Sequence, residues 1–67
     1  MLEFILNGKA LCIGEGMTIK ELLAVRGLDP ETLIVEHNGE LVRKEMWGGI
    51  ILKENDSLEI LRFVGGG

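Results

Sequence analysis

Short apolar runs separated by turn residues predict most of the elements of this chain. The first run, residues 2–6, ends at Asn7-Gly8, and a second run covers residues 9–13. Asn-Gly is the strongest two-residue signal for a type I′ hairpin, because both positions of that turn need positive φ. The turn fixes the register, so residues on alternate positions share a face. One face is formed by Leu2, Phe4, Leu11 and Ile13, and the other by Ile5, Ala10 and Cys12.

A helix is predicted after the first hairpin. Thr18 and Glu21 have the spacing of a capping box, in which each side chain bonds the other residue's backbone N–H. Gly27 is suited to the residue that ends the helix. The buried stripe, at i, i+3 and i+4, consists of Ile19, Leu22 and Leu23.

The second half of the chain repeats the hairpin pattern. A strand over 33–37 turns at Asn38-Gly39 into residues 40–42. The link at Asp29-Pro30 is expected to be irregular, and residues 43–47 to form an irregular or one-turn segment broken by Gly48-Gly49. The remaining predictions are an extended piece at 50–52, a polar turn at 54–57 and a last strand at 58–64.

The order hairpin, helix, hairpin and final strand describes an α+β fold of the β-grasp (ubiquitin-like) type. We expect a mixed sheet of four to five strands, with one main helix packed on one face and the final strand between the hairpins. The domain is assigned to residues 1–64, and residues 65–67 to a flexible carboxyl-terminal glycine tail.

Composition narrows the function. A chain of 67 residues is near the lower limit for a self-sufficient core and leaves little room for an enzyme's pocket. A net charge of −4 without basic clusters argues against nucleic acid and favours a protein partner with a basic surface. No apolar run approaches a membrane span and no secretion signal is visible, so a cytoplasmic protein away from membranes is expected.

Conventional catalytic chemistry is poorly represented. Cys12 is the single cysteine, which excludes an internal disulfide and a multi-cysteine metal site, and we expect it to be half-buried. His37 is the single histidine, and a reactive pair with Cys12 is disfavoured because nothing electropositive surrounds the thiol. The glycines around Glu15 lack the rest of a phosphate-binding loop. No metal site and no bound cofactor are predicted.

The final glycines are the strongest functional signal. A strand ending at Phe63-Val64 leads directly into Gly65, Gly66 and Gly67. Three extended residues reach about 10 Å, and without Cβ atoms they could thread a narrow channel and present the Gly67 carboxylate to another protein's active site. The alternative is an inert end, since termini tolerate any sequence and expression scars are often glycine-rich.

The sheet face away from the helix is the second signal. If Leu58 and Ile60 point to the helix, Leu61 and Phe63 lie on the open face. An apolar open face is a candidate docking surface, although scattered exposed apolar residues occur in every small protein. The predicted partner-binding residues are Ile5, Leu41, Leu61, Phe63 and Val64.

Particular segments resemble one known family. They are residues 35–40 (Val-Glu-His-Asn-Gly-Glu), Trp47, residues 56–60 and the ending Phe63 to Gly67. Together these are similar to the ThiS family of sulfur carriers, and the similarity runs essentially from end to end. Trp47 matches a family position and is interpreted as packing at the edge of the core.

The resemblance implies a sulfur donor for the thiazole half of thiamine. A ThiF-like adenylating enzyme would use ATP to convert the Gly67 carboxylate to an acyl-adenylate. Sulfur from a cysteine-derived persulfide donor would then replace AMP, giving a thiocarboxylate that a ThiG-like thiazole synthase consumes. Gly65 and Gly66 would be the threading segment. The chain would be a co-substrate and not itself an enzyme.

Three other functions share some of these features. A MoaD-like small subunit of molybdopterin synthase also ends in Gly-Gly, but it is usually longer. A ubiquitin-like modifier would be attached through its tail to lysines of other proteins. A non-catalytic interaction domain with an inert tail is the third alternative.

Overall fold

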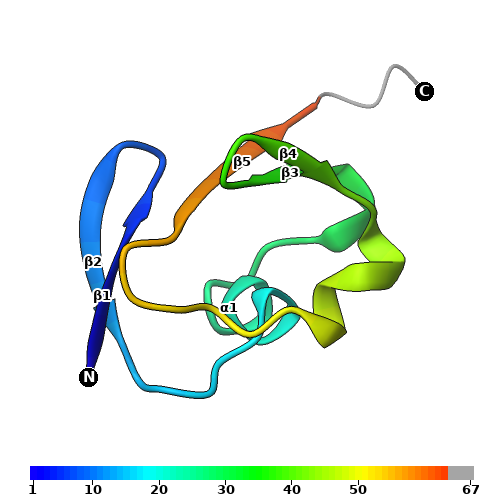
Figure 1. Ribbon diagram of the computed structural model, residues 1–67. Helices are drawn as coiled ribbons and strands as arrows, with labels where there is room; N and C mark the ends of the chain where they lie inside the picture. Colours follow the sequence, from blue (N-terminus) through cyan, green and yellow to red (C-terminus); the bar gives the residue numbers. More distant parts are fainter. Residues whose placement is uncertain (64–67) are drawn as a thin grey trace.

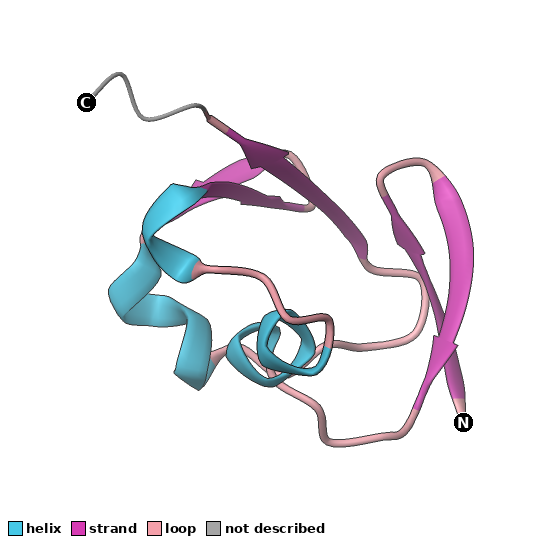
Figure 2. Cartoon of the chain, turned by 180° about the vertical axis from the view of Figure 1, so that it is seen from behind, coloured by secondary structure: helices cyan, strands magenta, loops and turns pink. Residues whose placement is uncertain are grey.

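A five-stranded mixed sheet wrapped around one helix forms the fold (Figures 1 and 2). The structure is a computed structural model, and it describes residues 1–63. The strands lie in the order β2-β1-β5-β3-β4, so β5 is in the centre between the two hairpins, as predicted. The strands are β1 (Leu2–Leu6), β2 (Lys9–Ile13), β3 (Leu33–His37), β4 (Glu40–Val42) and β5 (Ser57–Arg62). This arrangement confirms the β-grasp prediction.

Both hairpins turn at the predicted Asn-Gly pairs. Asn7 and Asn38 have φ of 49° and 52°, and the glycines that follow them have φ of 82° and 86°. Positive φ at both central positions matches the twist of the flanking strands. The register is also as predicted, with Phe4 opposite Leu11 and Val35 opposite Val42.

The helix α1 (Ile19–Val25) lies inside the curve of the sheet (Figure 1). Its capping box is complete, because Thr18 Oγ1 accepts from the Glu21 N–H at 3.1 Å and Glu21 Oε1 accepts from the Thr18 N–H at 2.9 Å. Gly27, with φ of 71°, follows the C-cap. The buried stripe of Ile19, Leu22 and Leu23 is as predicted.

The core lies between α1 and one face of the sheet. Trp47 is 2% exposed, and its indole Nε1 donates to the Val42 carbonyl oxygen at 3.1 Å. This contact confirms Trp47 as a packing residue and satisfies its polar atom inside the core. The fully buried side chains are Phe4, Ile19, Leu23, Val35, Leu52 and Leu58.

Several predicted boundaries are wrong. The last strand covers Ser57–Arg62 instead of 58–64. Gly48 and Gly49 do not break the segment after β4 but belong to the 3₁₀ helix η2 (Lys44–Gly49), because neither has a positive φ. The link after Asp29 is ordered as the 3₁₀ helix η1 (Pro30–Thr32), and the Asp29 carboxylate accepts a hydrogen bond from the Glu31 N–H at its start. Pro30 suits the first position of such a turn.

The piece at residues 50–52 is extended and lies at the edge of the core, as predicted. Ile51 forms a bridge with Thr18, and Leu52 is buried. The tail predicted at residues 65–67, and Val64 before it, lie outside the described residues.

Candidate partner-binding face

The open face of the sheet is the candidate site, because α1 covers only the opposite face (Figure 2). Along β5 and just beyond it, side chains alternate between the two faces. Leu58 is fully buried and Ile60 packs against the core, whereas Leu61 and Phe63 are 53% and 44% exposed. The predicted face assignment of these four residues is therefore confirmed.

Strand pairing brings apolar residues together at one end of this face. Leu61 on β5 lies directly opposite Ile34 on β3. The next residue of β3 on the same face is Glu36, and Leu41 on β4 lies opposite it. Phe63 continues the pairing beyond β5, because its N–H donates to the Thr32 carbonyl at 3.0 Å. Ile34 and Leu41 are exposed. We call these four side chains, Ile34, Leu41, Leu61 and Phe63, the apolar patch.

Ile5 does not belong to the apolar patch. It faces the open side, but it is opposite Ser57 at the beginning of β5. Leu61 is four residues further on, about 13 Å along a strand. Ile5 is also only half-exposed. Ile5 therefore lies on the predicted face but outside the apolar patch, and its role in partner binding stays a prediction. Val64 lies outside the described residues.

Two carboxylates separate Ile5 from the apolar patch. Glu36 and Glu59 are opposite each other in the β3–β5 pairing. Sequence analysis did not identify them as site residues. Their proximity depends on which residue of β5 pairs with which residue of β3, and the hairpin turns do not determine that register.

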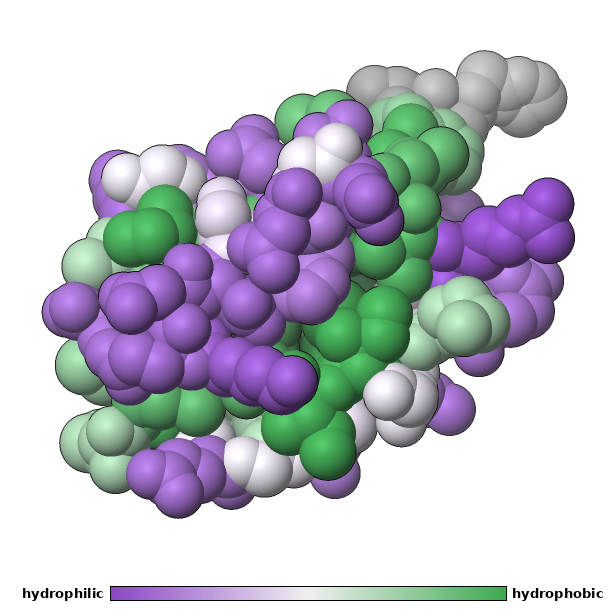
Figure 3. Space-filling model, viewed as in Figure 1, coloured by the Kyte–Doolittle hydropathy of each residue, from purple (hydrophilic) through white to green (hydrophobic). Residues whose placement is uncertain are grey.

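Exposed apolar surface also occurs elsewhere on the molecule. On the side drawn in Figure 3, hydrophobic side chains form a band in the right half of the picture, with hydrophilic areas on both sides. Met46 and Val25 are exposed and lie outside the sheet. Exposure alone therefore does not identify a docking face, and the apolar patch is distinguished by its position on the neighbouring strands β4, β3 and β5 and just beyond the end of β5.

Cys12 and His37 are not partners. Cys12 is on the edge strand β2 and His37 on β3, with β1 and β5 between them. At the usual strand spacing this separates them by about 14 Å. The expected half-burial of Cys12 is wrong, since the thiol is exposed on an edge strand with no neighbour beyond it in the described part of the chain.

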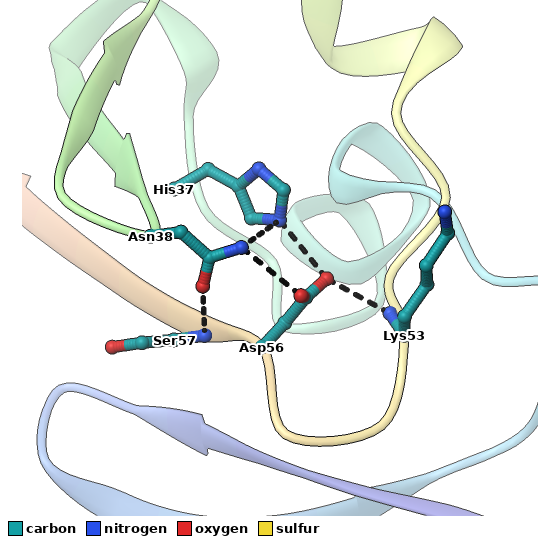
Figure 4. A network of polar contacts seen from close by, with 5 residues as sticks. All are labelled: His37, Asn38, Lys53, Asp56 and Ser57. Atoms are coloured by element: carbon teal, nitrogen blue, oxygen red, sulfur yellow. Dashed lines mark hydrogen bonds and ion pairs between the residues drawn. The ribbon is translucent and has the colours of Figure 1, made fainter.

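His37 instead belongs to a polar network with Asp56 (Figure 4). Its Nε2 lies 2.9 Å from Asp56 Oδ2, and Asp56 also accepts from the Asn38 amide at 3.1 Å and the Lys53 N–H at 2.9 Å. Burial acts to raise the pKa of Asp56, but hydrogen bonds from His37, Asn38 and Lys53 outweigh it, so the pKa is below its usual 3.8. The network joins the β3–β4 turn to the start of β5, which is a structural role.

A second ion pair lies on the helix side of the molecule. Lys44 contacts Glu31, joining η2 to η1. The hydrogen bond to Glu31 is the main reason that the pKa of Lys44 is raised from its usual 10.5. Both side chains are largely exposed, so the pair adds little to stability.

Residues 1–63 contain neither a cluster of metal ligands nor a helix that could span a membrane. Within residues 1–63, no three His, Cys, Asp or Glu side chains are grouped as metal ligands would be. None of the helices in that range is long and apolar enough to cross a membrane, and α1 has only seven residues.

The fold and face define the class: a small β-grasp domain with an apolar patch beside its last strand. Comparison with known proteins identifies the family. The ThiS family model matches residues 4–67, nearly the whole chain. The chain belongs to the ThiS family.

A named sulfur carrier and a solved structure, both similar to this chain, agree with the family assignment. The sulfur carrier protein ThiS of Bacillus subtilis (strain 168) is 44% identical over 50 residues, which are 75% of this chain and 76% of that protein. The crystal structure of the thiamine biosynthesis protein (ThiS) from Geobacter metallireducens superimposes with a TM-score of 0.83 at 33% identity. That match covers 98% of this chain and all of the other.

Other relatives are much longer proteins. A thiazole synthase of Magnetococcus marinus is 37% identical over 62 residues, and one of Paramagnetospirillum magneticum is 33% identical over 66 residues. The chain spans only 19% and 20% of their respective lengths. Each of these synthases therefore includes a segment similar to the present chain.

Proposed function

We propose that this protein is a sulfur carrier of thiamine biosynthesis whose reacting group is the carboxylate of Gly67. The observation that supports this most directly is the family match, which extends through the final glycines to residue 67. The apolar patch adds support, since Leu61 and Phe63 lie within a few residues of these glycines and offer a surface for docking.

The proposed chemistry takes place in three steps. A ThiF-like enzyme binds the carrier, and a carboxylate oxygen of Gly67 attacks the α-phosphorus of ATP, with pyrophosphate leaving. The terminal sulfur of a cysteine-derived persulfide then attacks the acyl carbon, and AMP leaves. A second thiol reduces the resulting sulfur–sulfur bond to give the thiocarboxylate. The carrier supplies a positioned acyl group and no catalytic side chain.

Thiazole synthase is the proposed acceptor of the sulfur. The two thiazole synthases that include a segment similar to this chain support such a pairing. A segment held in the same chain as its acceptor has a high effective concentration there. We propose that these steps occur in the cytoplasm, with ATP bound by the activating enzyme and no cofactor bound by the carrier.

The family match favours a sulfur carrier of thiamine biosynthesis over a MoaD-like subunit of molybdopterin synthase. A protein modifier is distinguished from a carrier by its product, because the modifier ends in an isopeptide bond and the carrier in sulfur. Both products can be detected by mass spectrometry.

The test is conversion of the carrier with purified components. Incubation with ATP, the ThiF-like enzyme of the same organism and a cysteine desulfurase with cysteine should raise the mass by one oxygen-to-sulfur exchange. Peptide fragmentation should assign the exchange to Gly67. Omitting ATP should prevent it, and a variant lacking Gly66 and Gly67 should remain unchanged in mass. No exchange in the wild-type protein, or exchange in the truncated variant, would refute the proposal.

A further inference from the structure

The open face carries a pair of like charges at its centre. Glu36 and Glu59 are direct cross-strand partners on β3 and β5, the two strands on which Ile34 and Leu61 also lie. Directly opposite residues have Cβ atoms about 5 Å apart, and like charges in that position destabilise a sheet. The free domain therefore places two negatively charged residues opposite each other on the face that α1 leaves uncovered.

No ion pair within residues 1–63 includes Glu36 or Glu59. Between residues 1 and 63, the ion pairs are His37 with Asp56 and Lys44 with Glu31, and neither Glu36 nor Glu59 takes part in a side-chain hydrogen bond. Arg62, close in sequence, follows Leu61 and so points to the other face of the sheet.

Apolar residues border the two carboxylates. Leu41 lies opposite Glu36 and is 70% exposed, while Leu61 and Ile34 form the next row along the strands. A protein docked on the apolar patch would displace water from around the carboxylates. Removing water strengthens their repulsion unless the docked surface supplies positive charge.

We infer that the partner on this face places a basic side chain, arginine or lysine, between Glu36 and Glu59, and that the partner is the thiazole synthase. An arginine guanidinium has enough donors to bond both carboxylates. The inference rests on the proposed function and adds to it the chemistry by which the acceptor recognises its carrier. The synthase is chosen because relatives of that name include a segment similar to this chain.

This arrangement makes stability and binding respond in opposite directions. Neutralising either glutamate removes the repulsion in the free domain and also removes an attraction in the complex. A pair that the partner does not contact would change stability and leave the affinity unaltered. The opposite signs therefore separate the two roles.

The experiment compares Glu36→Gln, Glu59→Gln and the double variant with the wild type. Affinity for the purified thiazole synthase of the same organism is measured by titration calorimetry at low and at physiological salt, and stability by thermal unfolding. The double variant should bind about tenfold more weakly, with a smaller salt dependence. Its melting temperature should be equal to or above that of the wild type.

Two further variants sharpen the comparison. Glu59→Lys should stabilise the free domain by a cross-strand pair with Glu36 and should bind the synthase more weakly than the double variant. Glu40→Gln is the matched control, because Glu40 is on β4 next to Leu41 but on the opposite face. Its affinity should remain within about twofold of the wild type, since only long-range charge is lost.

The inference is overturned if the double variant binds as tightly as the wild type, or if Glu40→Gln weakens binding equally. It is also overturned if the double variant loses affinity only for the ThiF-like enzyme and not for the thiazole synthase. A sedimentation experiment in which a second copy of the carrier covers the open face would overturn it as well. If the wild type shows no oxygen-to-sulfur exchange and no binding, the proposed function fails and the inference falls with it. If the wild type undergoes the oxygen-to-sulfur exchange but the double variant binds the synthase with unchanged affinity, the inference is refuted and the proposed function stands.

Discussion

Leu58 and Leu61 lie three residues apart on β5 and face opposite sides of the sheet. Leu58 is fully buried against the core, whereas Leu61 is 53% exposed and lies opposite Ile34. The same substitution at these two positions therefore tests folding at one and docking at the other.

We expect Leu58→Asp to unfold the domain and Leu61→Asp to leave it folded. A charge at position 58 would be buried without a partner, which costs several kcal/mol against a total stability of about 5–15 kcal/mol. Position 61 is hydrated in the free protein, so a charge there should weaken only binding to the partner enzymes. Circular dichroism and a pull-down with each enzyme provide the two measurements. Equal unfolding of both variants would contradict the face assignment.

Trp47 provides a test of the core. Trp47→Phe removes the indole N–H that bonds the Val42 carbonyl and leaves that part-buried acceptor without this donor. We expect a loss of about 1–3 kcal/mol in the free energy of unfolding, measured by urea denaturation. The neighbouring Met46→Ala is the control, because Met46 is exposed and its loss should change stability by less than about 0.5 kcal/mol. Similar effects at both positions would show that the indole hydrogen bond contributes nothing.

Asp56 should make stability dependent on pH in the acid range. The pKa of Asp56 is lower in the folded protein than its usual 3.8, so folding favours the ionised carboxylate. Its contribution is complete well above that value and is lost as pH falls through the lower, folded pKa. The stability difference between wild type and Asp56→Asn should therefore be constant near neutral pH and should shrink below about pH 4. Urea denaturation across this range measures it, and a difference that grows on acidification would reverse the assigned sign.

Local signals explain what could be predicted from the sequence. The Asn-Gly pairs at Asn7 and Asn38 determine their hairpins, and Thr18 with Glu21 starts the helix, because each signal acts within four residues. The order of these elements then leaves the centre of the sheet to β5. The alternation that exposes Leu61 follows from strand geometry alone.

Contacts between distant segments could not be predicted in this way. The bond from His37 to Asp56 spans 19 positions and forms only when β5 joins β3. The pairing of Glu36 with Glu59 likewise depends on the register of two strands that no hairpin connects. Cys12 is expected from the sequence to be half-buried, but it lies on the edge strand β2 and is exposed.

The last prediction concerns the glycines that carry the proposed chemistry. Gly66→Val should slow the oxygen-to-sulfur exchange at Gly67 by about tenfold or more, because a β-branched side chain is bulky in a narrow channel and disfavours positive φ. The melting temperature should not change, since glycine has no side chain to bury. Cys12→Ala is the control, because its thiol is assigned no part in the chemistry, and this variant should exchange at the wild-type rate. Rates are followed by intact-mass spectrometry at saturating ATP. A fast Gly66→Val variant would contradict the threading of this segment through a narrow channel, and loss of exchange in Cys12→Ala would transfer the sulfur chemistry to the thiol.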